Sequence, residues 1–204
     1  MNRKIFERGK LIMLFIIFFI NTGFPKEKST NNKSHLEIKF GYPFIFGYIG
    51  DKTVVSIPYI GVSYKTNMYK SEIVFWEHEL GYFGYTTDTN KYVETNKANA
   101  IPITFSVVWE TEIGSNFYLF LQIGFGSIIL YTKSGFSNKK SGFSGLMTLK
   151  SALFFTYRVS DNWYISLGGS LYMAQDVKEY AIGKNLNYYF ISSFIASYSF
   201  YGNT

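Results

Sequence analysis

Few residues in this chain of 204 residues are suited to acid–base or metal chemistry. It has no cysteine, and its two histidines are His35 and His78. His78 lies between Glu77 and Glu79, but this is not the zinc-binding H-E-x-x-H motif, because Tyr82 stands where the second histidine belongs. No glycine motif that would cradle a phosphate appears. The sequence therefore predicts a protein without catalysis, cofactor or metal, in which these carboxylates form a polar patch.

Charged residues offer a second kind of chemistry, the binding of ions or of a charged partner. One set falls on the polar side of alternating segments: Glu37, Lys39, Lys70, Glu72, Glu110, Lys150 and Arg158. Both signs occur, so in an enclosed interior these groups must form ion pairs or stay hydrated.

A second set of charges consists of lysines in polar connecting segments: Lys91, Lys97, Lys133, Lys139, Lys140, Lys178 and Lys184. They outnumber the carboxylates of the same segments, which are Asp88, Glu94, Asp176 and Glu179. Either these lysines keep exposed loops soluble, or they meet an anionic partner.

Composition restricts the class of protein that can carry these charges. Aromatic residues make up 21% of the chain and hydrophobic residues 47%, yet the mean hydropathy is only +0.02. Apolar residues are therefore interleaved with polar ones. Charged residues are 17%, below the roughly 25% of soluble domains. The net charge is +6, but four cations lie in the first ten residues, so the remainder is only mildly basic and gives no case for nucleic acid.

The first segment has the layout of a secretory signal peptide. A basic head precedes the apolar run 11–20, which is shorter than the roughly 20 residues of a membrane-spanning helix. We predict a signal peptide at 1–23, with an uncleaved anchor as the alternative, and a flexible periplasmic leader at 24–33. The absence of cysteine excludes a lipoprotein anchor.

Strand-like alternation continues from residue 34 to the end of the chain, and it is clearest in 187–200, NYYFISSFIASYSF. This run exceeds the 9–11 residues that cross a bilayer at a tilt. We expect eight strands, at 36–42, 53–64, 68–85, 101–110, 118–126, 147–158, 163–173 and 187–200. Pro58 predicts a bulge, and a second bulge is expected at 75–79. The inward or outward phase of 53–64 and 75–80 stays open.

Connections between these strands alternate between longer polar segments and tight turns, among them 65–67 and 160–162. The pattern predicts an all-β domain at 34–204, an eight-stranded antiparallel up-and-down transmembrane β-barrel. A soluble lipocalin-like or avidin-like barrel is the alternative, because alternation alone does not say which face points inward. Rings expected at the two ends of the strands favour the membrane barrel, since they would form interfacial belts. These rings are Tyr64, Tyr69, Trp109, Phe117, Tyr157, Trp163 and Phe200 at one end, and Tyr82, Phe83, Tyr85 and Tyr131 at the other.

A signal peptide, eight strands and a final strand ending near Phe200 resemble the OmpA-like and OmpX-like families of small outer-membrane barrels. Residue usage rich in lysine, asparagine, isoleucine and phenylalanine also resembles that of spirochaete outer-membrane proteins. The resemblance implies location in the bacterial outer membrane, periplasmic termini and insertion by the barrel-assembly machinery. The four residues after Phe200 depart from the family pattern, in which the aromatic residue is last.

Two functions are compatible with these features. In the first, surface loops bind a partner: outer-membrane lipid, a lipopolysaccharide-like or other anionic surface, or, by resemblance, host matrix or complement proteins. In the second, the barrel is a small water-filled channel, for which Gly124, Gly126, Gly168 and Ser170 would leave space. Barrel enzymes that modify lipid A carry histidine with serine and a carboxylate, and no such histidine–serine pair is evident.

Overall fold

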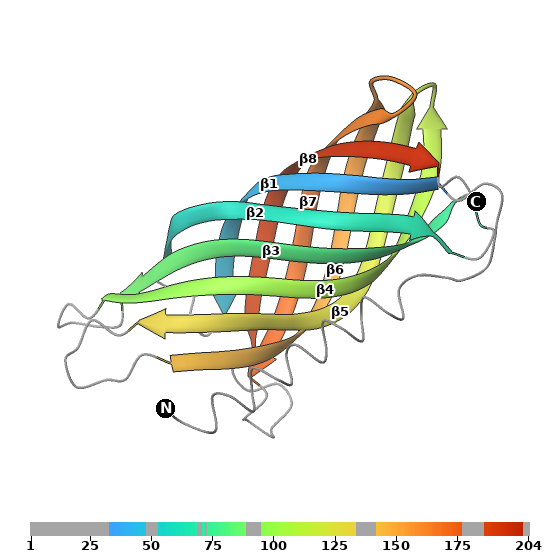
Figure 1. The fold of residues 1–204 in the computed structure, drawn as a ribbon. Helices are drawn as coiled ribbons and strands as arrows, with labels where there is room; N and C mark the ends of the chain where they lie inside the picture. The colour runs from blue at the N-terminus through green and yellow to red at the C-terminus, as the bar shows by residue number, and fades with distance from the viewer. Residues whose placement is uncertain are drawn as a thin grey trace. The chain divides into compact units, whose positions relative to one another are not determined.

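The computed structural model describes residues 33–47, 53–68, 71, 73–88, 95–133, 142–176 and 186–201. These residues form eight strands: β1 (Lys33–Gly47), β2 (Thr53–Asn67), β3 (Val74–Asp88), β4 (Thr95–Gly114), β5 (Phe117–Lys133), β6 (Gly142–Arg158), β7 (Trp163–Asp176) and β8 (Asn187–Tyr201). Each strand pairs antiparallel with the next, and β1 pairs with β8, so the sheet closes (Figure 1). The predicted eight-stranded up-and-down barrel is confirmed.

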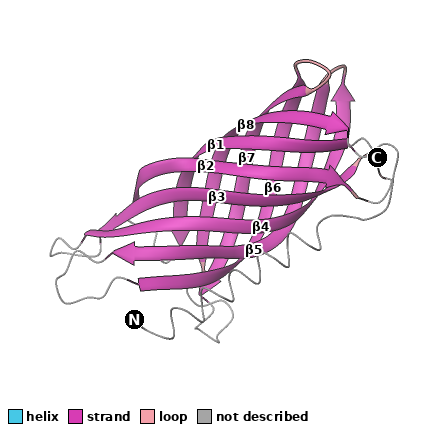
Figure 2. Ribbon diagram, in the orientation of Figure 1, coloured by secondary structure: helices cyan, strands magenta, loops and turns pink. Residues whose placement is uncertain are grey.

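Strand accounts for almost all of the described chain, as Figure 2 shows. Among the described residues, no helix is long and apolar enough to cross a membrane. The predicted signal peptide at 1–23 and the leader at 24–33, except Lys33, lie outside the described residues and stay predictions. Lys33 itself is the first residue of β1.

The outer face of the barrel is apolar, and its interior holds charged and polar side chains together with apolar ones. On β1, Leu36 and Phe40 are 53% and 51% exposed, whereas Glu37 and Lys39 are each 2% exposed. Strand β6 keeps the same alternation along its length. A barrel in water has the opposite polarity, with its apolar face inside. The soluble alternative is therefore wrong, and the observed polarity is that of a membrane barrel.

Aromatic residues mark both ends of the apolar outer face. Near the start of β1 and the end of β8, the outward rings include Trp109, Phe117, Tyr157, Trp163 and Phe200, as predicted. At the opposite end Tyr82 and Tyr131 also lie on the outer face, but Phe83 and Tyr85 are 0% and 2% exposed and fill the interior. Tyr69 lies outside the described residues.

Several strand boundaries differ from the prediction. Lys65–Asn67, predicted as a tight turn, belongs to β2, where Lys65 pairs with His35 and Glu77. The chain reverses after this strand, where the Met68 amide donates to the Val74 carbonyl at 2.8 Å. Strand β4 begins at Thr95, six residues before the predicted start, because a backbone ladder can continue where side chains turn polar.

The two predicted bulges have opposite outcomes. Register shifts between Val55 and Ile57, and between Ile57 and Ile60, confirm the irregularity expected around Pro58. No shift occurs at 75–80, where β3 pairs regularly with both neighbours. Alternation is therefore continuous through Glu77 and Glu79, and both side chains point inward.

Candidate functional site

Side chains fill the described interior of the barrel in three levels. Towards the longer connections lies an apolar cluster made of Ile45, Tyr59, Phe83, Tyr85, Ala98, Ala100, Ile128, Leu130, Leu146, Tyr172, Ala174, Tyr189 and Ile191. Towards the short turns lies a smaller one made of Phe75, Val108, Phe120, Ala152, Phe154 and Ile195. Between them lies a cluster of charges that we call the ion-pair network. Its members are Glu37, Lys39, Lys65, Glu77, Glu79 and Lys150.

Two lysines share two glutamates at the centre of the ion-pair network. Lys39 Nζ lies 2.9 Å from Glu77 Oε1 and also contacts Glu79 Oε2. Lys150 Nζ lies 3.0 Å from each of the same two oxygen atoms. Because Lys150 is on β6 and the glutamates are on β3, these contacts cross the barrel interior.

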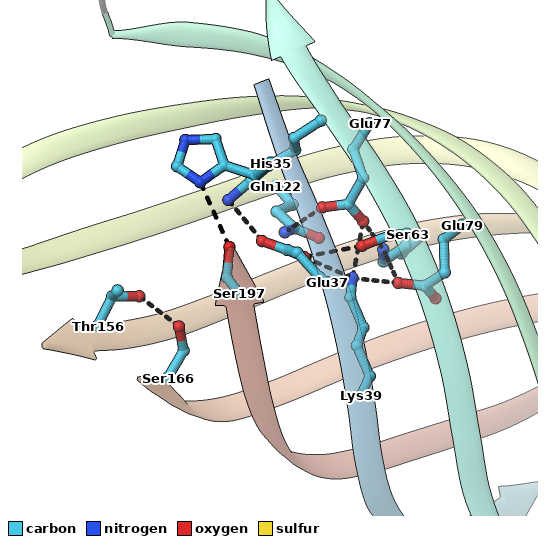
Figure 3. Close-up of polar contacts among 12 residues, drawn as sticks. His35, Glu37, Lys39, Ser63, Glu77, Glu79, Gln122, Thr156, Ser166 and Ser197 are labelled. Carbon is cyan, nitrogen blue, oxygen red and sulfur yellow. Dashed lines mark hydrogen bonds and ion pairs between the residues drawn. The ribbon is translucent and has the colours of Figure 1, made fainter. Parts of the chain in front are cut away.

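A second ion pair extends the network towards the start of β1 and the end of β8. Lys65 Nζ lies 2.7 Å from Glu37 Oε1, and the other oxygen of Glu37 accepts a hydrogen bond from Ser63 at 2.8 Å (Figure 3). The Lys65 ammonium also lies 3.9 Å from the centroid of the Phe120 ring, within the range of a cation–π contact. Lys39 joins the two parts, with its Nζ 3.5 Å from Glu37 Oε2.

Neutral donors complete the coordination of the central carboxylates. Glu79 Oε1 accepts hydrogen bonds from the Tyr59 hydroxyl at 3.0 Å and from the Tyr172 hydroxyl. Glu77 Oε2 accepts one from the Gln122 amide at 2.9 Å. Both carboxylates are thus satisfied from several strands, which is the condition for keeping a buried charge.

Charge is balanced within the ion-pair network, which pairs three glutamates with three lysines. All six side chains are at most 2% exposed. An unbalanced charge in such an interior would cost several kcal/mol. The arrangement therefore supports a structural plug and leaves no net charge in the network to select an ion.

The predicted interior charges have different positions. Glu37, Lys39 and Lys150 lie in the ion-pair network, and Glu110 lies nearer the start of β1, 3.9 Å from Lys33. Arg158 differs from the prediction, because its side chain is 35% exposed and pairs at 2.6 Å with Asp161 in the β6–β7 turn. Lys70 and Glu72 lie outside the described residues.

Sequence reasoning did not assign Lys65, Glu77 and Glu79 to the interior. The sequence pattern predicts Lys65 in a tight turn and the two glutamates in a polar patch at the barrel rim. Both assignments are wrong, because these residues are at most 3% exposed inside the barrel. The local alternation of Glu77 and Glu79 with Trp76 and Leu80 was the signal that could have placed the glutamates on one face.

The histidines are on opposite faces of the barrel wall. His35 is 1% exposed inside, with Nδ1 3.3 Å from Ser197 Oγ, between the rings of Phe75 and Tyr164. Folding thus brings together a histidine and a serine that are far apart in the sequence (Figure 3). Both are closed to solvent, so the pair has a packing role. His78 lies on the outer face, 5.0 Å from the Phe105 ring.

The interior glycines mark close approach between strands and do not line open space. A methyl group added at Gly126 would collide with the Ile103 carbonyl, and one at Gly168 with the Leu153 carbonyl. At Gly124 it would meet the Phe105 carbonyl and Ser106. The predicted space for a channel at these glycines is therefore absent. No group of histidine, cysteine, aspartate and glutamate able to hold a metal occurs among the described residues.

Two of the predicted loop lysines fall within the described residues. Lys97 and Lys133 are exposed and lie directly opposite each other on β4 and β5, at the end with the longer connections. The other five lie outside the described residues: Lys91, Lys139, Lys140, Lys178 and Lys184.

No known family model and no curated protein sequence matches the chain. Solved structures do match its fold. Neisserial surface protein A is 12% identical with a TM-score of 0.55, covering 85% of this chain and 100% of that one. Ail, the attachment invasion locus protein of Yersinia pestis, solved with the heparin analogue sucrose octasulfate, is 13% identical with a TM-score of 0.54, covering 83% and 99%.

A major outer membrane protein from Thermus thermophilus has the same fold, with 8% identity and a TM-score of 0.55, covering 83% of this chain and 99% of that one. The fold is therefore that of small outer-membrane β-barrels, in agreement with the resemblance seen in the sequence. Identities this low establish the architecture alone.

Proposed function

We propose that this chain is a non-enzymatic integral protein of the bacterial outer membrane whose loop end binds an anionic partner. The termini lie in the periplasm, and the longer connections face outward. One observation carries the proposal: the ion-pair network crosses and fills the interior of an apolar-faced barrel. Because the interior is occupied by side chains, the surface that remains for a partner is the loop end of the barrel.

The chemistry of the loops supports a polyanion as the partner. Lysines outnumber carboxylates in the longer connections, and a cationic surface attracts a polyanion by long-range forces that salt weakens. The similar barrel Ail was solved with a heparin analogue, which is a sulfated ligand of this class. Sulfated or phosphorylated glycans, lipopolysaccharide-like surfaces and acidic patches of matrix or complement proteins share this chemistry.

A small channel is the second candidate, favoured by unpartnered polar atoms along one wall. Thr104 Oγ1, Ser106 Oγ and Gln122 Oε1 are buried without a hydrogen-bond partner, on the adjoining strands β4 and β5. Buried polar atoms of this kind are commonly satisfied by water. A thin hydrated path beside the ion-pair network would then carry protons or small ions.

Two measurements on the purified full chain separate these functions. In planar bilayers we expect no stable unitary conductance, whereas reproducible conductance steps would support the channel and overturn the plug. In lipid nanodiscs we expect soluble heparin to bind at low salt and to dissociate as salt rises.

Substituting alanine for Lys139, Lys140, Lys178 and Lys184 should weaken heparin binding by at least tenfold. Arg158→Ala is the matched control, since Arg158 lies at the opposite end of the barrel and should leave binding unchanged. Heparin binding that is independent of salt and unchanged by the four substitutions would refute a cationic loop surface.

A further inference from the structure

Two lysines face each other on the outer surface of the barrel. Lys97 and Lys133 are Cα partners, and both lie on the face opposite to the buried side chains of Ala98 and Leu130. Like charges directly opposite one another on a sheet repel. Among the described residues, neither lysine has an ion-pair partner. An anion placed between the two ammonium groups would convert this repulsion into attraction.

Polar and aromatic side chains lie one row below the lysines on the same outer face. Asn99 pairs with Tyr131, and the Tyr82 hydroxyl donates to Asn99 Oδ1 at 3.0 Å. The Tyr131 ring lies 4.8 Å from that of Phe143, centroid to centroid. Tyrosines of membrane proteins concentrate at the depth of the lipid headgroups. The lysine pair, two residues further out, therefore lies at the level of headgroup phosphates.

An apolar groove of about 310 Å³ begins directly below this row and runs across β3 to β2. Its lining residues are Ile60, Gly61, Val62, Leu80, Gly81, Tyr82 and Ile101. The paired glycines Gly61 and Gly81 form its floor, backed on the inner side by the Tyr59 ring. Ile101 is four residues from Lys97, about 13 Å along a strand.

We propose that this surface binds one anionic membrane lipid, with its phosphate between Lys97 and Lys133 and an acyl chain in the groove. Charge complementarity selects a phosphate-bearing headgroup, and the apolar lining selects a hydrocarbon chain. The distance between the two parts suits a single amphipathic molecule, whereas a small soluble anion has no apolar chain to place in the groove. The inference rests on the proposed membrane location, but it does not need the anionic partner of the loops.

Native mass spectrometry of the full chain, released from detergent with added phosphatidylglycerol or phosphatidylcholine, tests the site. We expect one phosphatidylglycerol to be retained in preference to phosphatidylcholine. Substituting both lysines, K97A with K133A, should weaken retention of phosphatidylglycerol about 30-fold, because each cation near the membrane surface contributes about fivefold and the two factors multiply. K97R with K133R keeps both charges and should keep the lipid.

Two further variants examine the groove and the folding of the protein. Leu80→Trp fills the groove without touching the lysines and should weaken retention of both lipids. Arg158→Ala removes an exposed cation at the other end and should change nothing. Every variant is first checked for its folded form by its shift in migration on boiling, so that loss of lipid is not loss of the barrel.

Equal retention of the two lipids by the unmodified chain would overturn the proposal, as would unchanged retention by the double alanine variant. Binding of soluble glycerol phosphate as tight as that of phosphatidylglycerol would also overturn it, because a free anion would then suffice. Heparin binding reports separately on the proposed function. If the chain retains phosphatidylglycerol but does not bind heparin, only the loop partner is refuted. If the chain binds heparin but does not retain phosphatidylglycerol, only the lipid site is refuted.

Discussion

Removing one charge from the centre of the ion-pair network should lower the free energy of unfolding far more than removing two charges of opposite sign. Lys150→Met deletes an ammonium group that lies 3.0 Å from both Glu77 Oε1 and Glu79 Oε2. Lys39 then remains to neutralise both carboxylates, and one negative charge stays buried. The second substitution Glu77→Gln restores the balance by removing that charge.

The magnitude follows from the distances. At 3.0 Å and an effective dielectric constant of about 20, each charge contact amounts to roughly 5 kcal/mol before desolvation is subtracted. Desolvation cancels most of this, so the measured loss should be that of a broken buried pair, about 3–5 kcal/mol. The double variant, Lys150→Met with Glu77→Gln, should recover most of the loss. Arg158→Ala, which breaks an exposed pair with Asp161, should cost less than about 1 kcal/mol.

Urea unfolding of the barrel in lipid vesicles, followed by tryptophan fluorescence, measures these free energies. Trp109 and Trp163 are 40% and 52% exposed on the lipid-facing surface, so their emission shifts when the barrel leaves the bilayer. The balance argument would be refuted if Lys150→Met cost no more than Arg158→Ala. It would also be refuted if adding Glu77→Gln increased the loss.

Two further substitutions test the glycine contacts and the polarity of the wall. Gly126→Ala forces a methyl group against the Ile103 carbonyl and should lower the free energy of unfolding by about 1–3 kcal/mol in the same assay. Gly145→Ala is the control and should be neutral, because no atom lies within 4 Å of the added methyl group. Equal effects of the two substitutions would contradict the strand contact. Phe125→Arg places a charge on the outer face, where Phe125 is 56% exposed, and should lower the free energy of unfolding by about 2–4 kcal/mol if that face meets lipid. Ile113→Arg, near the β4–β5 turn, should change it by almost nothing. A tolerated arginine at position 125 would indicate that this face meets water.

The barrel was predictable from the sequence because its alternation signal repeats in most of the strands, although the phase of 53–64 and 75–80 stayed open. Alternation of apolar and polar residues requires no knowledge of partners, and eight segments with alternating connection lengths determine the order of an up-and-down barrel. Strand ends were less accessible. Residues 95–97 and Asn99 are polar and still extend β4, since the ladder depends on backbone groups that every non-proline residue carries.

The ion-pair network was only half predictable, because alternation gives the face of a residue but not its height in the barrel. Glu37, Lys39 and Lys150 were placed inside by alternation, but their partners come from strands β2 and β3. A contact across the barrel between Lys150 and Glu77 depends on the tilt and register of strands that are not neighbours. Neither quantity is encoded in a single segment.

The pairing of Lys97 with Lys133 could not be predicted from a single segment either. Lys97 and Lys133 are 36 positions apart in the sequence, and each alone is an ordinary loop cation. Only the register of β4 against β5 places them opposite each other, above Tyr131 and Asn99. The lipid site is therefore a property of strand pairing, and a one-residue slip would move one lysine to the interior face.

The neutral interior and the basic exterior have complementary consequences. Because the ion-pair network balances three glutamates with three lysines, it projects little field beyond the barrel, and the cations that a partner meets are those of the loops and of the pair Lys97 and Lys133. Changing the network should thus alter stability without altering the salt dependence of heparin binding. Changing the loop lysines should do the reverse. A variant that changed both the stability and the salt dependence of heparin binding would mean that the interior and the loops are coupled, which a rigid plug does not allow.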